Sequence, residues 1–193
     1  MNGTTTVSLV GVGGQGILLA AAILAETAAA EGLDVKASEV KGMAQRGGSV
    51  LSIVRFGAKV WSPVARYADV VIATEALEGR RALSLLPDRG TLVYATTMIA
   101  PGSVLRGERD YPDDIVAAAR ARGIQLIAVD AESLAREAGT VRAANVALLG
   151  AATHVLPFGA RAWEHALELA VPAKVLEVNQ RAFALGREAA AAT

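Results

Sequence analysis

The stretch Gly11-Val12-Gly13-Gly14-Gln15-Gly16 decides the fold of this chain. It follows an apolar run, Val7–Val10, and precedes a longer apolar run of helix-forming residues, Ile17–Ala30. Glycine permits a tight turn and lets a ligand approach the backbone closely, and the N–H groups of a first helical turn attract anions. The stretch therefore predicts a Rossmann-like strand, turn and helix, with a phosphate-binding edge at the turn.

A second glycine cluster, Lys41-Gly42-Met43-Ala44-Gln45-Arg46-Gly47-Gly48-Ser49, follows the next predicted strand, Asp34–Val40. The planar guanidinium of Arg46 suits a phosphate or a carboxylate, and the flanking glycines leave room for a ligand. An ion pair of Arg46 with Glu39 or Glu75 is the alternative. We expect the two clusters to face one ligand.

The residues predicted to contact a cofactor or substrate belong to these clusters: Gly11, Gly13, Gly14, Gln15, Gly16, Gln45, Arg46, Gly47 and Gly48. Gln15 is open to two interpretations, because its amide could donate to a phosphate or could simply close the loop. Glu75 ends a predicted strand, where residues of open parallel sheets contact ligands, but a helix cap is the preferred interpretation. No catalytic residue is expected, because no nucleophile and base come together in the sequence.

The spacing Gly11-X-Gly13-X-X-Gly16 also fits the dinucleotide fingerprint. In that alternative the chain would be a free-standing oxidoreductase, and Glu39 would bond a ribose hydroxyl. Against it, the elements after Glu39 do not repeat a second mononucleotide-binding half. A third interpretation is a purely structural subunit whose glycines pack against a partner.

Strands alternate with helices along the rest of the chain, which favours a three-layer α/β/α domain with a mostly parallel sheet over residues 1–193. A hairpin from Ser49–Phe56 into Lys59–Ser62 would make the sheet mixed. Further strands are predicted at Asp69–Thr74, Gly90–Ala95 and Ile124–Val129, and from Ala131 onward the pattern is helical.

Two predicted helices are apolar all round, Ile17–Ala25 and Asn145–Ala152. A helix without a polar face is normally buried on every side, and a single small domain cannot cover all its outer helices. The pattern favours a subunit interface, and a central helix in an alanine-rich core is the alternative.

The composition excludes several classes of function. The 193 residues hold 19 basic and 19 acidic residues, so no basic surface for nucleic acid is expected. There is no cysteine and there are two histidines, so neither an iron–sulfur cluster nor a zinc site is expected on this chain. The N-terminus is unlike a signal peptide and no apolar stretch is long enough for a membrane span, so we expect a soluble, cytoplasmic protein.

Taken together, the sequence resembles the gamma-domain family of the 2-oxoacid:ferredoxin oxidoreductases over nearly its whole length. Within that family it is most similar to the beta subunit of indolepyruvate ferredoxin oxidoreductases, through Gly-Met-Ala-Gln-Arg-Gly-Gly-Ser of the second cluster. The resemblance rests on both glycine clusters and on two later segments, Gly139–Gly150 with Asn145 and Pro172–Gly186 with Asn179 and Ala182-Phe183.

This resemblance implies an enzyme subunit that is inactive alone. The complete enzyme would decarboxylate an aryl 2-oxoacid oxidatively, form an acyl-coenzyme A and pass two electrons to ferredoxin. Thiamine diphosphate and [4Fe-4S] clusters would be held by a larger partner subunit, while this chain shapes the cleft for coenzyme A. Independently of the resemblance, the exposed apolar faces could pair two copies of the chain into a homodimer when the partner is missing.

Overall fold

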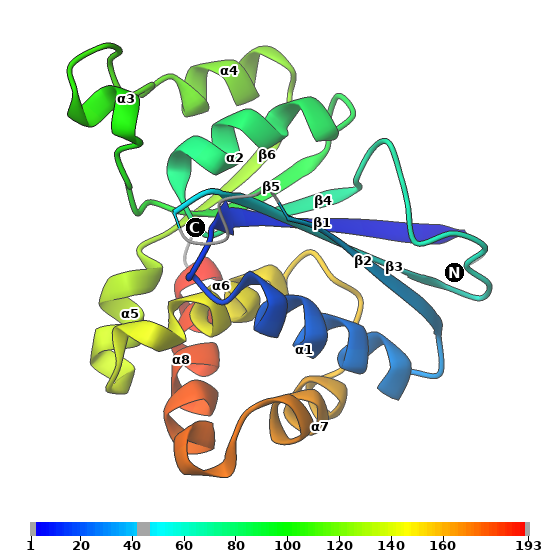
Figure 1. The fold of residues 1–193 in the computed structure, drawn as a ribbon. Helices are drawn as coiled ribbons and strands as arrows, with labels where there is room; N and C mark the ends of the chain where they lie inside the picture. Colours follow the sequence, from blue (N-terminus) through cyan, green and yellow to red (C-terminus); the bar gives the residue numbers. More distant parts are fainter. Residues whose placement is uncertain (1–2, 42–46, 192–193) are drawn as a thin grey trace.

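The computed structural model describes residues 3–41 and 47–191, and it folds them into one mixed six-stranded sheet with helices on both faces (Figure 1). The strand order is β2-β3-β1-β4-β5-β6. The strands are β1 Thr4–Val12, β2 Asp34–Lys41, β3 Ser49–Gly57, β4 Val70–Ala73, β5 Thr91–Ala95 and β6 Gln125–Val129. The predicted three-layer α/β/α fold is confirmed.

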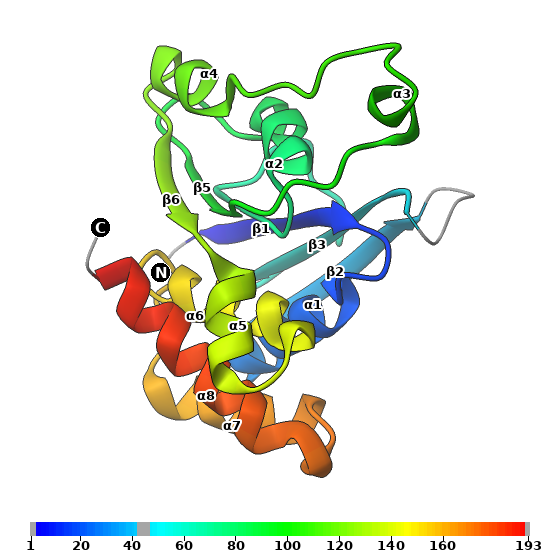
Figure 2. The ribbon, with the colours of Figure 1, turned by 90° about the vertical axis from the view of Figure 1, so that its left-hand side faces the viewer.

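The helices divide between the two faces. In Figures 1 and 2, α2 and α4 lie above the sheet, and α1 and α5 to α8 lie below it. Their bounds are α1 Ile17–Ala30, α2 Ala76–Ala82, α3 Gly102–Leu105, α4 Ile115–Ala121, α5 Ala131–Ala138, α6 Ala144–Ala152, α7 Ala160–Ala170 and α8 Ala173–Ala191, with short 3-10 turns at Leu83–Leu85 and Val141–Ala143.

Strand β1 runs parallel to β4, and β4, β5 and β6 are parallel to one another. Strand β3 is antiparallel to both of its neighbours, β1 and β2. The prediction that Ser49–Phe56 pairs with residues 59–62 is therefore wrong. Strand β3 pairs with the preceding strand β2, and residues 59–62 form no strand. The second glycine cluster lies in sequence between β2 and β3, and its last residue, Ser49, pairs with Val12 at the end of β1.

Helix α1 has the predicted bounds because a glycine stands at each end. Gly16 is its N-cap in a left-handed conformation, with φ of 76°. Gly32, with φ of 75°, follows its C-terminus, where glycine ends a helix without the strain of a Cβ.

Helix α6 is buried within this chain, so the expectation that it forms a subunit interface is not needed. It crosses α8 closely at two glycines. A Cβ on Gly150 would collide with the carbonyl of Phe183, and one on Gly186 with the carbonyl of Ala147. The apolar pattern of α6 thus reflects the second interpretation, a central helix in an alanine-rich core.

Candidate functional site

The site lies where the parallel strands β1 and β4 end side by side. In the sheet, β3 and β2 follow β1 on one side, and β5 and β6 follow β4 on the other side. Open α/β sheets bind ligands at such a switch of strand order, outside the carboxyl ends of the strands. The first glycine loop leaves β1 here, and Thr74 and Glu75 follow β4.

The two glycine clusters meet at this edge. The N–H of Gly13 donates to the carbonyl of Gly48 over 2.8 Å, and the N–H of Gly47 donates to the carbonyl of Gly13 over 3.2 Å. The structure therefore brings together the described members of both clusters. Gln45 and Arg46 lie outside the described residues, and their contact with a ligand stays a prediction.

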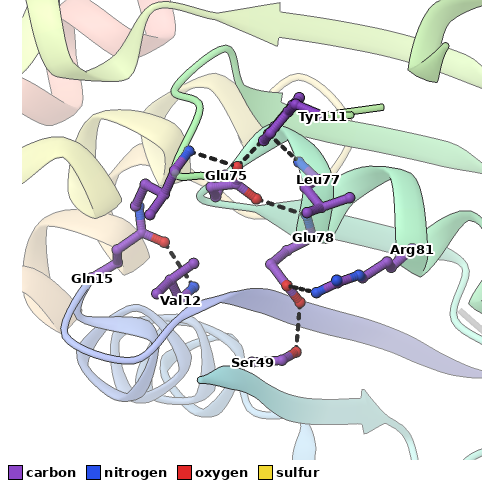
Figure 3. Close-up of polar contacts among 9 residues, drawn as sticks. Val12, Gln15, Ser49, Glu75, Leu77, Glu78, Arg81 and Tyr111 are labelled. Atoms are coloured by element: carbon purple, nitrogen blue, oxygen red, sulfur yellow. Dashed lines mark hydrogen bonds and ion pairs between the residues drawn. The ribbon is translucent and has the colours of Figure 1, made fainter. Parts of the chain in front are cut away.

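Gln15 is bonded to Val12 within the loop (Figure 3) and to Thr74, the residue that follows β4. Its Oε1 accepts from the N–H of Val12 and the hydroxyl of Thr74, each over 2.8 Å. Its Nε2 donates to the carbonyl of Thr74 over 3.0 Å. Gln15 closes the loop, as one of the two interpretations held, and its second amide hydrogen has no acceptor among the residues that the structure describes.

Gly11 and Gly16 are needed for packing. Gly11 is buried in β1, where a Cβ would collide with the hydroxyl of Thr74. A Cβ on Gly16 would stand 2.5 Å from Nδ2 of Asn145. That amide nitrogen donates to the carbonyl of Gly16 over 2.9 Å and ties α6 to the glycine loop. The loop is therefore the partner of the Asn145 amide nitrogen, while the buried Oδ1 of Asn145 has no hydrogen-bond partner among the described residues.

A cleft of about 410 Å³ opens beside the glycine loop. Gly14, Gln15 and Gly16 form one wall, Thr97 and Ile99 after β5 contribute to another, and Arg142 stands among the lining residues. The sequence did not single out Thr97, Ile99 or Arg142. Thr97 and Ile99 follow a parallel strand at its carboxyl end, a position that could have flagged them.

The N-terminal ends of α1, α5 and α6 contribute residues to the lining of this cleft, and of these only α5 is capped by a side chain, that of Asp130. No side chain caps α1 at Gly16, so the partial positive charge of its first turn faces the cleft. The first amides of α2 are all taken within the chain. Ala76 N–H donates to Thr97, Leu77 N–H to the Tyr111 hydroxyl, and Glu78 and Gly79 N–H to Glu75.

Glu75 caps α2 as expected, and its carboxylate does more than cap. Its Oε2 accepts from the N–H of Glu78 over 2.8 Å, and its Oε1 accepts from the N–H of Ile99 over 2.9 Å and from the Tyr111 hydroxyl. Burial and this carboxylate raise the pKa of Tyr111, so the phenol keeps its proton and remains a donor.

Glu78 of α2 is also buried, and it binds the last residue of the second cluster, Ser49 (Figure 3). Its Oε2 accepts from the hydroxyl of Ser49 over 2.5 Å, and its Oε1 pairs with Arg81 over 2.5 Å. Ser49 directly follows Gly48, so the end of the second cluster is anchored both to the first glycine loop and to α2.

The geometry argues against a dinucleotide site of the Rossmann type. In that fold the acidic residue stands at the end of a strand parallel and adjacent to the first. Here β3 lies between β1 and β2, and Glu39 is exposed on β2 at the edge of the sheet. The ribose contact proposed for Glu39 is therefore not supported.

The chain gives no place to a metal centre or a membrane span within its described part. No group of three or more histidine, aspartate or glutamate side chains in residues 3–41 and 47–191 is arranged to hold a metal ion. None of the helices in those ranges is long and apolar enough to cross a bilayer.

Comparison with known proteins gives the family. Residues 6–189 match the family "Pyruvate ferredoxin/flavodoxin oxidoreductase". The chain is 39% identical over 190 residues to "Indolepyruvate oxidoreductase subunit IorB" of Pyrococcus horikoshii, with 94% of each chain covered. It is 28% identical to "Ketoisovalerate oxidoreductase subunit VorA" of Methanothermobacter thermautotrophicus, matching 35% of that longer protein.

A solved structure has the same fold over the whole length. The gamma subunit of a keto/oxoacid ferredoxin oxidoreductase from Geobacter sulfurreducens superposes with a TM-score of 0.75 at 26% identity, with 98% of this chain and 99% of that chain covered. The family match, the IorB relatives and this fold agree with one another. The chain belongs to the pyruvate ferredoxin/flavodoxin oxidoreductase family, as a homologue of its indolepyruvate oxidoreductase subunits.

Proposed function

We propose that this chain is the smaller subunit of an indolepyruvate ferredoxin oxidoreductase and forms one wall of the coenzyme A cleft. The observation that carries the proposal is the likeness to IorB subunits, which covers 94% of both chains at 39% identity. The reaction would convert an aryl 2-oxoacid, coenzyme A and two oxidised ferredoxins into an acyl-coenzyme A, CO₂, one proton and two reduced ferredoxins.

The redox cofactors of such an enzyme do not fit this chain. Iron–sulfur clusters need thiolate ligands, and the chain has no cysteine. In residues 3–41 and 47–191 no three histidine, aspartate or glutamate side chains are grouped so as to hold a metal ion, such as the one that accompanies a bound diphosphate. We therefore assign thiamine diphosphate and the [4Fe-4S] clusters to a larger partner subunit, through which ferredoxin is also reached.

What this chain contributes is the cleft beside the first glycine loop. Coenzyme A carries phosphates, and the open N-terminus of α1 at Gly16 attracts anions. Gly14 is exposed at the mouth of the cleft, and Arg142 adds a positive charge. Gly13, Gly47 and Gly48 hold the two clusters together behind this wall. Arg46 would add a second guanidinium from the second cluster.

The experiment is co-purification of the tagged chain from its native host at low salt. A brown complex with a larger, cysteine-rich subunit that reduces a dye with indolepyruvate and coenzyme A would support the proposal. A colourless protein that binds a nicotinamide cofactor alone would contradict it. If Arg46→Ala leaves the activity of the complex and its affinity for coenzyme A unchanged, Arg46 has no role in binding coenzyme A.

If the chain is a purely structural subunit, the same co-purified complexes give a different result. In that case changes at the glycine loop alter the amount of complex, while the assembled enzyme keeps its kinetic constants. Measuring complex yield and the KM for coenzyme A on the same preparations separates the two.

A further inference from the structure

Thr97 and Ile99, which line the cleft, lie beyond the last ladder pair of β5 and β6, where the N–H of Thr96 still donates to the carbonyl of Val129 over 2.9 Å. Two hydrogen bonds to the start of α2 fix Thr97 and Ile99. The N–H of Ala76 donates to the carbonyl of Thr97 over 2.9 Å, and the N–H of Ile99 donates to Oε1 of Glu75 over 2.9 Å.

The same carboxylate oxygen also receives the other end of this segment. The Tyr111 hydroxyl donates to Oε1 of Glu75 and accepts from the N–H of Leu77 over 2.9 Å (Figure 3). The N–H of Ile99 and the hydroxyl of Tyr111 thus both donate to Oε1 of Glu75. The residues between them form the segment with α3 that projects from the sheet at the top of Figure 2.

Capping alone does not explain this arrangement. The preferred residues at a helix N-cap have short side chains, Ser, Thr, Asp or Asn. One oxygen of Glu75 already serves as the cap by accepting from Glu78. The Glu75 side chain is only 1% exposed, and a buried carboxylate oxygen needs hydrogen-bond donors from the protein. Its second oxygen finds these donors at the two ends of the 99–111 segment.

We propose that Glu75 and Tyr111 are positioning residues for the cleft, which set the Thr97–Ile99 wall at a fixed distance from the glycine loop. The inference rests on the proposed function, since the ligand of the cleft is taken to be coenzyme A. Neither side chain is among the residues lining the cleft, so they act through Ile99 and not by contact.

The test uses the complex of this chain with its larger partner, in two variants. Glu75→Asp keeps a good N-cap but is one methylene too short to serve Ile99 and Tyr111 as well. Tyr111→Phe removes only the hydroxyl. We expect each to raise the KM for coenzyme A and its Kd, measured calorimetrically without the 2-oxoacid, about five- to tenfold, with kcat within about twofold of wild type.

Tyr94→Phe is the matched control, because Tyr94 is also buried and its hydroxyl makes no hydrogen bond to the described residues. It should leave both constants unchanged. If both test variants bind coenzyme A as the wild type does, the inference is overturned while the proposed function stands. If the wild-type complex shows no turnover with indolepyruvate and coenzyme A, the proposed function itself fails.

Discussion

The N–H of Gly13 donates to the carbonyl of Gly48 over 2.8 Å, so two glycine clusters separated by a helix and a strand form one continuous edge. The contact extends the β1–β3 ladder one step past its last pair, Val12 with Ser49. The clusters are therefore two halves of one structural feature.

Ser49→Ala should destabilise the purified chain by about 1–3 kcal/mol, because it leaves the buried Glu78 carboxylate without its hydroxyl partner. Ser84→Ala is the control, since its exposed hydroxyl donates only to the carbonyl of Arg81. Urea unfolding gives both values. Equal small losses in the two variants would mean that Glu78 does not need Ser49.

Gly16→Ala should cost more stability than Gly14→Ala. Both glycines have positive φ, 76° and 109°, so both substitutions strain the backbone by about 1–2 kcal/mol. Only at Gly16 would the new Cβ meet Asn145, at 2.5 Å, whereas the space at Gly14 is open. The difference in unfolding free energy between the variants measures this collision. No difference would show that Asn145 moves aside freely.

Gly186→Ala should be among the most disruptive single-methyl additions, costing about 3 kcal/mol or more, because the methyl would enter the carbonyl of Ala147 and force α6 from α8. Gly159→Ala is the control. Its new Cβ would meet only the end of the Glu31 side chain, which can move. Thermal unfolding compares them, and similar melting temperatures would contradict the tight helix crossing.

The sequence predicted the elements with strong local signals and missed those that depend on distant neighbours. Helix α1 and most strands were located because glycines and apolar runs mark their ends. The partner of β3 was wrong because alternating apolar residues specify a strand but not which strand it pairs with. An all-apolar helix such as α6 cannot reveal whether its own chain or a partner covers it.

The site shows the same division. The glycine loop was recognised because its chemistry lies in one stretch. Tyr111 went unnoticed because its hydrogen bond to Glu75 joins residues 36 positions apart. Arg142 reaches the cleft from the short turn before α6, and no local pattern connects it with the end of β1.

Arg142→Ala should raise the KM for coenzyme A in the assembled complex about three- to tenfold, because the cleft loses a positive charge beside the α1 N-terminus. The kcat should change little, since the guanidinium would contact a phosphate and not the reacting atoms. Arg161→Ala on α7, an exposed arginine away from the cleft, is the control. Equal KM values for the two variants would exclude Arg142 from the coenzyme A site.

Asp130 makes a small part of the stability depend on pH. It caps α5 through a hydrogen bond from the N–H of Ser133 over 3.1 Å. The hydrogen bonds from Ser133, helped by the charge of Arg136, lower the pKa of Asp130 below its ordinary value of 3.8. Since the folded pKa is below the unfolded one, the contribution is full above pH 4 and is lost as the pH falls through the folded pKa.

Asp130→Asn keeps an N-cap side chain but removes this titration. The unfolding free energy of the wild type should therefore exceed that of the variant at pH 6, and the gap should narrow between pH 4 and pH 2.5. Asp110→Asn, which also removes one negative charge but at an exposed position outside any helix cap, is the control for the change in charge. A gap for Asp130→Asn that widens in acid would reverse the sign of the linkage and contradict the charged cap.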